Sequence, residues 1–458
     1  MAETLPLMAR VEGEGRVDLD VRDGHVVAAR LAITEPARLF EKLLEGRHAL
    51  DVPDLVARIC GICPAAYQLT AVQALEQALG VEPDPWALAM RRLLSCGERI
   101  ESHCLHLHLL ALPDVLGFPD AATMARRHPD QVTRGLALQE VGNEIIRLLG
   151  GRAVHPVGLT VGGFLAAPRP ADVERVAALV VAALPQALDL VRWAAGLPGQ
   201  GAELDVARVA LRADTGYPLG AGGIVVLPSG HGRDDVLPAP LDVPGFAARI
   251  EERQVSHSTA LHARLDGAPY LVGPLARVAV NADRLAPAVT ALLLRSGAAL
   301  PSADLMRSLL ARAVEVHLAL AEALRLLSDY RVPRRPAEPV PPRPRGRGAG
   351  GGAGGGVGFG ATEAPRGVLW HRYELDGDGV VVRARIVPPT SQNQACIEEH
   401  LRRTVEALGP HLPLAQLQRH CESIVRCYDP CISCATHAVR VRLHDVSGDL
   451  SGDVSGGR

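Results

Sequence analysis

Residues 58–64 read RICGICP and residues 428–437 read YDPCISCATH, so one Cys-x-x-Cys pair lies near each end of the chain. The turn between two cysteines at this spacing brings both thiolates to one side of the backbone. Two such turns that meet in space make a site of four sulfurs, although 368 residues (431 − 63) separate Cys63 from Cys431. We therefore expect a fold whose N-terminal and C-terminal segments meet at a metal site.

The spacing of the two pairs leaves the kind of metal open. Four thiolates would satisfy a tetrahedral structural zinc ion, but zinc sites usually keep their two pairs within about 15 to 20 residues. On spacing alone, structural zinc and a redox or catalytic metal are equally favoured. A disulfide is less favoured, because nothing in the sequence indicates an oxidising compartment.

The composition is that of a globular protein. Of 458 residues, 48% are hydrophobic and 22% are charged, and 48 basic against 51 acidic side chains give a net charge of −3. This balance gives no electrostatic reason to expect binding to nucleic acid. Glu3, Glu12 and Glu14 stand where a secretory signal would have basic residues, and Pro185 and Asp189 interrupt a long apolar stretch. We expect a cytoplasmic protein with no direct membrane insertion.

The spacing of apolar residues predicts an α+β fold that is predominantly α. Residues 17–31 alternate around a turn at Asp23-Gly24, and residues 369–387 do so around a turn at 376–379, which predicts two antiparallel β-hairpins. Helical spacing covers residues 85–112, 129–149, 171–195 and 286–327. We expect a bundle of long helices with small antiparallel hairpins attached.

Residues 332–360 are rich in proline and glycine and predict a surface loop or linker. A literal G-x-G-x-x-G occurs there at Gly350, Gly352 and Gly355. Because no strand precedes it and no amphipathic helix follows, we do not interpret it as a nucleotide site. Residues 443–458 repeat Ser-Gly-Asp and predict an unstructured tail.

Three further motifs accompany the cysteine pairs: RVEGEG at 10–15, GGRAVHP at 150–156 and EAPRG at 363–367. In content and order, the five motifs resemble the large subunit of nickel-iron hydrogenases, and the resemblance runs through almost the whole chain. Around the first cysteine pair the sequence is similar to the soluble NAD(P)-linked or sulfhydrogenase-like branch. The resemblance implies an enzyme that cleaves dihydrogen reversibly.

The resemblance also implies the ligands of the metals. Cys60 and Cys431 correspond to terminal ligands of nickel, and Cys63 and Cys434 to thiolates that bridge nickel to an iron ion with CO and cyanide ligands. Soft thiolates suit both metals, and dihydrogen, a very weak acid, needs a metal to take hydride and a base to take the proton. A terminal thiolate can be that base.

Other residues resemble groups around the center. Glu12, in RVEGEG, corresponds to the carboxylate that receives the proton from Cys431. Arg366, in EAPRG, corresponds to an arginine over the open coordination position, and Asp114 and Asp429 correspond to the aspartates that hold it. Without the resemblance, these would be read as surface charges and ordinary ion pairs.

Glu41, in RLFEKLLEGR, and His437 resemble the ligands of a magnesium ion. A carboxylate suits magnesium, whereas an imidazole is unusual for it, so this site rests on the resemblance. His103 and His106 lie three residues apart, but we expect packed or hydrogen-bonded roles for them rather than metal binding. Tyr67 stands where many members of the family have a histidine, so the surroundings of Cys63 depart from the family pattern.

We expect residues 1–437, with the loop at 332–360, to form the catalytic domain and residues 438–458 to be removed by a maturation endopeptidase. Since the chain has no ferredoxin-like cysteine run, the electrons require an iron-sulfur small subunit, with further flavin or NAD(P) subunits in a heteromultimer. Two alternatives stay open. One is a noncatalytic scaffold held by zinc, and the other is a dihydrogen sensor with the same center.

Overall fold

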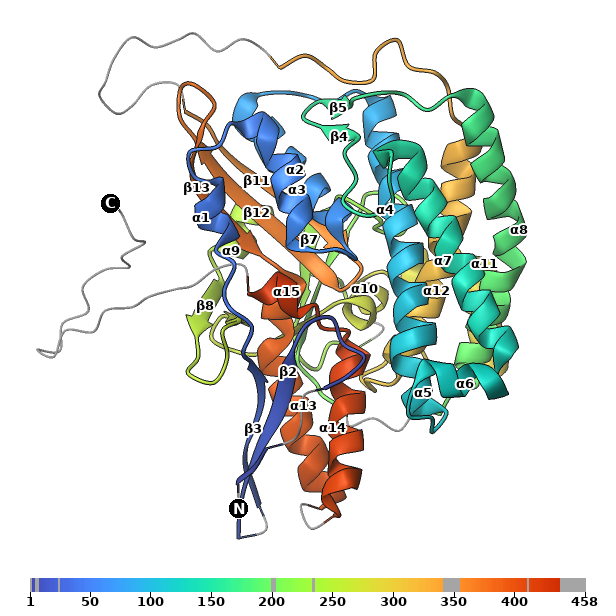
Figure 1. Ribbon diagram of the computed structural model, residues 1–458, viewed down its shortest axis with the longest axis vertical. Coiled ribbons are helices and arrows are strands. Elements are labelled where there is room, and N and C mark those ends of the chain that lie inside the picture. The colour runs from blue at the N-terminus through green and yellow to red at the C-terminus, as the bar shows by residue number, and fades with distance from the viewer. Residues whose placement is uncertain are drawn as a thin grey trace, which may run out of the picture.

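Figure 1 shows the computed structural model, which describes residues 2–4, 8–23, 25–198, 203–232, 235–340, 355–409 and 412–436. The chain is 50% helical and 19% strand, which confirms a predominantly α fold with small sheets. The helices are α1 (Phe40–Leu44), α2 (Val52–Val56), α3 (Pro64–Leu79), α4 (Pro85–Leu105), α5 (Leu112–Val115), α6 (Ala121–Arg127), α7 (Pro129–Gly150), α8 (Pro170–Ala195), α9 (Val243–Ala247), α10 (Pro274–Val280), α11 (Pro287–Ser296), α12 (Arg307–Ser328), α13 (Pro389–Leu408), α14 (Leu414–Tyr428) and α15 (Ile432–Ala435). The strands are β1 (Ala2–Thr4), β2 (Gly15–Arg22), β3 (His25–Ile33), β4 (Leu159–Thr160), β5 (Gly163–Phe164), β6 (Ala207–Arg212), β7 (Gly223–Leu227), β8 (Ile250–Gln254), β9 (Leu261–Leu265), β10 (Tyr270–Val272), β11 (Val357–Ala364), β12 (Gly367–Leu375) and β13 (Val381–Val387).

Helices α4, α7, α8 and α12 form the expected bundle, on the right in Figure 1. Their apolar residues face one another and make up much of the largest hydrophobic core. Helix α4 is capped at its start by Asp84, whose side chain accepts a hydrogen bond from the backbone N–H of Ala87 at 2.7 Å. Gly142 of α7 lies against α4 so closely that a Cβ there would be 2.5 Å from the backbone nitrogen of Glu101.

Two predicted helices differ in the structure. The helical pattern over residues 286–327 is divided into α11 and α12, because Gly297 ends α11 with a left-handed backbone and Pro301 follows. The pattern over residues 85–112 is α-helical only to Leu105, and a π-helical segment, His106–Ala111, continues it into α5. Such segments are frequent at functional sites.

The two predicted hairpins are confirmed as β2–β3 and β12–β13, both antiparallel. Strand β11 pairs with β12 to complete a three-stranded sheet, and β8–β9 and β4–β5 form two smaller antiparallel pairs. In the sheet β10-β6-β7, β10 runs parallel to β6, which departs from a purely antiparallel expectation.

Glycines at the end of the glycine-rich segment have a structural role that the sequence did not reveal. Strand β11 begins at Val357, inside the range expected to be loop, and α3 lies directly on it. A Cβ on Gly358 would be 1.8 Å from the carbonyl oxygen of Ala74, and one on Gly360 would be 2.3 Å from that of Thr70. Glycine here allows the backbone of α3 to approach the sheet.

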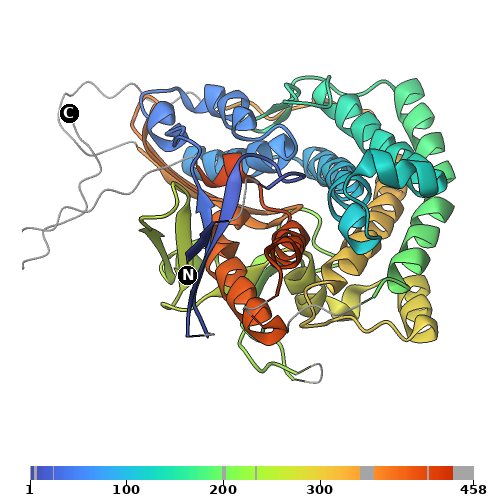
Figure 2. The same ribbon diagram turned by 60° about the horizontal axis from the view of Figure 1, so that its bottom comes forward.

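The two ends of the described chain meet, as the fold prediction required. The backbone of Glu12 pairs with that of Cys431 as an isolated parallel bridge, and Arg38 N–H donates to the carbonyl of Thr436 at 2.7 Å. Figure 2 shows the blue N-terminal strands beside the red and orange C-terminal helices α13 to α15. This meeting place is where the second cysteine pair lies.

One helix of the described chain, α8, is long and apolar enough to cross a membrane by length and composition. Its most apolar window has a mean hydropathy of 1.5, and 33% of that window is buried. The helical pattern over residues 171–195 is confirmed, and α8 continues through Pro185. Since α8 packs against α7, α11 and α12, this criterion is weak evidence for a membrane span.

Candidate metal centre

Cys60 and Cys63 lie in the turn that leads into α3. The carboxyl group of Glu98, on α4, accepts hydrogen bonds from the backbone N–H of Ala65 at 2.7 Å and of Ala66 at 3.0 Å. Burial raises the pKa of Glu98 to about 8, so this group carries little charge beside the thiols at neutral pH. Glu98 therefore anchors the start of α3, and with it the turn that carries Cys63.

Cys431 and Cys434 lie where α14 has ended and α15 begins. Asp429 ends α14 in the left-handed region with φ 58°, which turns the chain back towards the N-terminal segment. The hydroxyl of Thr390, on α13, accepts a hydrogen bond from the backbone N–H of Cys431 at 3.0 Å. The carbonyl of Glu12 accepts one from the N–H of Ile432 at 3.1 Å. Segments from both ends of the chain thus fix this turn.

The four thiols converge at one point. The Sγ atom of Cys60 lies 2.6 Å from that of Cys63 and 3.5 Å from that of Cys431, and the Sγ atoms of Cys63 and Cys434 are 3.7 Å apart. All four side chains are buried and free of disulfides, and their sulfurs lie within 4.8 Å of one another. Four soft donors gathered around one point fit a center that contains nickel and iron.

The pKa values of the four thiols are shifted in different directions. Burial raises the pKa of Cys63, Cys431 and Cys434 above that of a free thiol. Burial acts on Cys60 in the same direction, but hydrogen bonds from the other three thiols and the charge of Arg366 bring the pKa of Cys60 well below its usual range. The cluster therefore favours a negative charge on Cys60, as a cation site requires.

Arg366 lies beside the thiols in the turn between β11 and β12. Its Nε donates to the carbonyl oxygen of Asp429 at 2.7 Å, and its Nη2 donates to Asp429 Oδ1 at 3.1 Å. Although burial opposes a charge there, Asp429 and the thiolates raise the pKa of Arg366 well above its usual range. Its Nη1 is buried without a hydrogen-bond partner among the described residues, so one donor remains available.

Asp114 does not hold Arg366, which corrects the expectation from sequence. Its Oδ2 accepts from Nη1 of Arg426 at 2.7 Å, and its Oδ1 forms an ion pair with Arg10. Arg426 in turn donates to the carbonyl of Ala9 at 2.8 and 2.9 Å. Asp114 lies on α5, directly after the π-helical segment, and contacts α14 through Arg426.

Glu12 lies against the second cysteine pair. Its Oε2 accepts a hydrogen bond from the backbone N–H of Ser433 at 3.0 Å, and its side chain is half-buried. Glu14, by contrast, is exposed, and its backbone N–H donates to Oε1 of Glu35. Of these two acidic residues of the motif, Glu12 is the one whose carboxylate contacts the backbone of the second cysteine pair.

Glu41 is buried on α1, and its Oε1 accepts from the backbone N–H of Ile386 at 2.8 Å. His437, its expected companion, lies outside the described residues, as do the tail 438–458 and the glycines Gly350 and Gly352. The chain is described as far as Thr436.

The histidines of α4 and its π-helical extension make hydrogen bonds within the protein. His103 Nε2 lies 2.7 Å from Glu315 Oε2, and His106 Nε2 lies 2.6 Å from the carbonyl of Arg426. Tyr67 is buried on α3 with its hydroxyl unpartnered among the described residues, and burial together with the nearby thiolates raises its pKa well above the usual range. Tyr67 therefore stays neutral beside the cluster.

A buried network that the sequence analysis missed supports the turn of Arg366. Arg277, on α10, pairs with Glu315 at 2.6 Å and with Glu363 at 2.7 Å, and all three side chains are fully buried. It also donates to the carbonyls of Ala364 at 2.9 Å and Pro365 at 2.6 Å. The available signal was a charge inside an apolar stretch, such as Glu315 in AVEVHLAL.

The sequence model of the family described as nickel-dependent hydrogenase matches residues 38–133 and 248–437. Among curated relatives, the sulfhydrogenase 2 subunit alpha of Pyrococcus furiosus is 34% identical over 435 residues, covering 94% of this chain and 98% of the relative. The subunit beta of the NAD-reducing hydrogenase HoxS of Cupriavidus necator is 28% identical over 506 residues, with 97% of each chain covered.

Solved structures share the fold. An NAD+-reducing [NiFe]-hydrogenase in the H2-reduced state superposes with a TM-score of 0.83 at 25% identity, covering 95% of this chain and 99% of that one. The Ni-Fe-Se hydrogenase of D. vulgaris Hildenborough has a TM-score of 0.75 at 24% identity, covering 95% of this chain and 100% of that one. The match therefore extends over nearly the full length of both proteins.

Proposed function

The chain belongs to the nickel-dependent hydrogenase family, and from this premise we propose that it is a large subunit that cleaves dihydrogen reversibly and heterolytically. It is an oxidoreductase that acts on dihydrogen at a nickel-iron center. The observation that carries the proposal is the convergence of four buried, free thiols from the two ends of the chain.

Metal analysis with infrared spectroscopy tests this proposal. We expect nickel and iron in the purified complex, infrared bands of CO and cyanide, and dye reduction that depends on dihydrogen. Cys434→Ser should lose nickel and activity, whereas Cys421→Ser, a buried cysteine of α14 outside the cluster, should keep both. Zinc without nickel would indicate the scaffold alternative, and the same infrared bands with negligible steady-state turnover would indicate a sensor.

When bound, the nickel-iron center with CO and cyanide ligands supplies the site that polarises dihydrogen and takes up its electrons. Cys60 and Cys431 would hold nickel as terminal ligands, and Cys63 and Cys434 would hold both nickel and iron. The thiolate of Cys431 accepts the proton, since a base must act beside the metal. The hydrogen bond from the backbone N–H of Cys431 to the hydroxyl of Thr390 holds the backbone of Cys431 in place.

Glu12 receives the proton from Cys431 in this proposal. Its carboxylate accepts a hydrogen bond from the N–H of Ser433, two residues from Cys431, and its half-buried side chain is partly open to water. Its backbone contact with Ile432 keeps it in register with the second cysteine pair.

Arg366 has an electrostatic role in this proposal. Asp429 holds the guanidinium through two hydrogen bonds, which leaves Nη1 as a buried donor without a partner among the described residues. A fixed positive dipole there stabilises negative charge that develops beside the metal without Arg366 being a ligand.

We propose that Glu41, with His437, holds a magnesium ion near the end of the processed chain. A buried carboxylate oxygen is the kind of donor that magnesium prefers. Metal analysis of Glu41→Gln should show loss of magnesium with nickel retained if the two sites are separate.

For the electrons, we propose an iron-sulfur small subunit and a route to NAD(P) through flavin-containing partners in the cytoplasm. Support comes from relatives named as a sulfhydrogenase subunit alpha and a subunit of an NAD-reducing hydrogenase. Reduction of NAD or NADP by dihydrogen in the purified complex tests this route, and activity with artificial dyes alone would argue against it.

We propose further that residues 1–437 form the mature catalytic domain, with 438–458 removed by a maturation endopeptidase. The match to the family model ends at residue 437, which supports this boundary. The intact mass of the active chain should correspond to an end at His437, and a chain that retains the tail while carrying nickel would contradict the cleavage.

A further inference from the structure

A second cluster of metal-binding side chains lies away from the cysteines. His257, in the loop between β8 and β9, His262 on β9 and Glu398 on α13 offer ligand atoms that all lie within 4.8 Å of one another. Two imidazoles and one carboxylate are the donor set of several zinc sites that keep an open position. None of these residues takes part in the function proposed above.

Glu398 is oriented towards both rings. Its Oε1 lies 2.7 Å from Nε2 of His257 and accepts a hydrogen bond from the backbone N–H of Leu31 at 3.1 Å. Its Oε2 faces Nδ1 of His262 at 4.0 Å, which is beyond hydrogen-bond distance. An ion about 2.0–2.2 Å from each donor would fit between them after small adjustments.

His262 lacks the partner that a buried imidazole needs. Its exposed fraction is only 5%, its Nε2 has no hydrogen-bond partner among the described residues, and its Nδ1 has only the distant Glu398. Nδ1 is the ring nitrogen that faces the carboxylate of Glu398, so it can offer its lone pair to a cation. A metal ion bound at Nδ1 would give this nitrogen the partner that Glu398, at 4.0 Å, does not provide.

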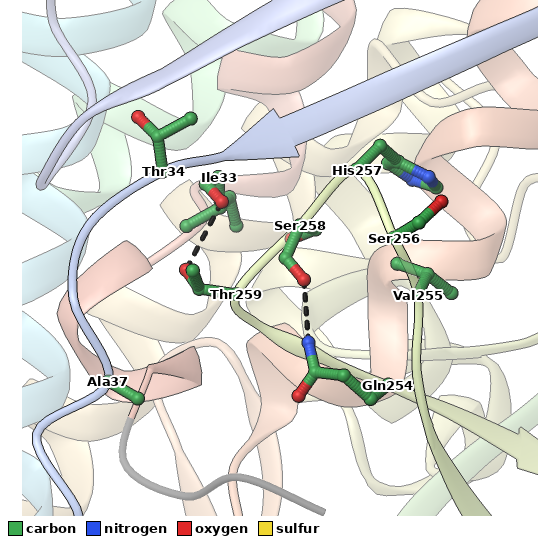
Figure 3. A pocket seen from close by; sticks show the side chains of 9 residues that line it. All are labelled: Ile33, Thr34, Ala37, Gln254, Val255, Ser256, His257, Ser258 and Thr259. Atoms are coloured by element: carbon green, nitrogen blue, oxygen red, sulfur yellow. Dashed lines mark hydrogen bonds between the residues drawn. The ribbon is translucent and has the colours of Figure 1, made fainter. Parts of the chain in front are cut away.

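The cluster is also accessible. The side chains of His257 and Glu398 are 21% and 20% exposed, so an ion can enter and water can complete its coordination. His257 lines an open pocket of about 480 Å³, together with the end of β3 and the loop that follows β8. Figure 3 shows His257 at the edge of this group, with Thr259 and Gln254 holding the loop by hydrogen bonds to Ile33 and Ser258.

We propose that His257, His262 and Glu398 bind a divalent transition-metal ion of the zinc class, with water completing the coordination. The ion joins the β8–β9 loop, strand β9 and helix α13, and Glu398 links it further to β3 through Leu31. Helix α13 also carries Thr390, which holds the backbone of Cys431. The proposed ion therefore joins elements of the scaffold that supports the second cysteine pair.

Zinc binding to the holoenzyme tests the site, because the four cysteines are then occupied. After dialysis against a chelator that leaves nickel in place, Zn²⁺ should bind with a stoichiometry of one per chain. His262→Ala and Glu398→Gln should each weaken zinc binding at least about tenfold. Mutation of residues that only support a metal ligand already lowers metal affinity by about 10- to 100-fold. His420→Ala, an exposed histidine of α14, is the control and should bind as the wild type does.

X-ray absorption at the zinc edge gives a second readout. We expect nitrogen and oxygen neighbours at about 2.0–2.1 Å, with imidazole scattering and no sulfur shell. His257→Ala changes a ligand that is more exposed than His262, so it disturbs the fold less. It should cause the same loss of zinc binding. A sulfur shell, equal binding by wild type and variants, or no bound zinc would overturn the proposal.

Discussion

The hydroxyl of Thr390 accepts a hydrogen bond from the backbone N–H of Cys431 at 3.0 Å, although 41 residues separate them in the chain. Thr390 is buried in the first turn of α13, whose other residues pack against β3, β9 and β10. The position of the second cysteine pair is thus fixed from the interior of the fold as well as by the N-terminal segment.

Thr390→Val should weaken the metal site while leaving its four thiols in place. The substitution keeps the shape of the side chain but removes the acceptor for the N–H of Cys431. Loss of a residue that supports a metal ligand through a hydrogen bond typically lowers metal affinity by about 10- to 100-fold. Nickel content per chain and resistance to a chelator measure the effect. Thr390→Ser restores the hydroxyl and should restore both, and a valine variant with normal nickel retention would show that the contact is dispensable.

Glu12→Gln should slow proton transfer without loss of metal. Glutamine still accepts a hydrogen bond from Ser433 N–H, so the local fold is kept, but it cannot take a proton. Steady-state dihydrogen oxidation should fall by about 10²- to 10⁴-fold, the range usual for a lost general base. Nickel and iron contents should be unchanged, and Glu14→Gln should behave as wild type. Equal losses in the two variants would remove the special role of Glu12.

Arg366→Lys should reduce kcat even though the charge is kept. An ammonium group cannot donate to the carbonyl and carboxylate of Asp429 and still direct a further donor towards the cluster. We expect a loss of about 10²-fold or more, as for removal of one preorganised donor. Arg372→Lys, in a half-exposed ion pair on β12, is the matched control. Unchanged turnover in Arg366→Lys, with full metal content, would refute this role.

Much of the architecture could be predicted from sequence because it rests on local patterns. The hairpin at β2–β3 follows from alternation around Asp23-Gly24, and α7 follows from apolar spacing after Pro129. The convergence of the cysteines followed from the two Cys-x-x-Cys turns. The break between α11 and α12 was missed because apolar spacing continued while Gly297 supplied the stop.

The rest depended on contacts between distant segments. Asp114 was paired with the wrong arginine, because its partner Arg426 lies 312 residues away and no local pattern connects the two. Gly358 was read as part of a linker, whereas its role is to admit the carbonyl of Ala74. The pairing of Arg277 with Glu363 likewise joins segments whose proximity only the folded chain reveals.

Asp114→Asn should affect stability more than catalysis, since Asp114 bridges Arg10 and Arg426 rather than Arg366. Its side chain is only 15% exposed, and loss of its charge leaves two guanidinium groups less well compensated. We expect a loss of about 1–3 kcal/mol in the free energy of unfolding. Denaturant melts measure it, with exposed Asp130→Asn as the control. A collapse of turnover at normal stability would support the original assignment to Arg366 instead.

His106 should make the folded chain sensitive to acid. Burial lowers its pKa to about 4, and its Nε2 lies 2.6 Å from the carbonyl of Arg426, an arrangement that suits a neutral ring donating its proton. In the unfolded chain the pKa returns to about 6.5, so between pH 6.5 and 4 the unfolded state binds one more proton. Stability contributed by this residue is therefore complete above pH 6.5 and is lost as the pH falls, by about 2 kcal/mol at pH 5.

His106→Gln should remove that pH dependence, because the amide still donates to Arg426 but does not titrate. The difference in unfolding free energy between pH 7 and pH 5, measured by urea denaturation, should be smaller in the variant by about 2 kcal/mol than in wild type. His420→Gln, at an exposed position, should leave the difference unchanged. If wild type and His106→Gln lose stability in parallel, His106 is charged in the folded protein, and its hydrogen bond to the carbonyl then outweighs the cost of burial.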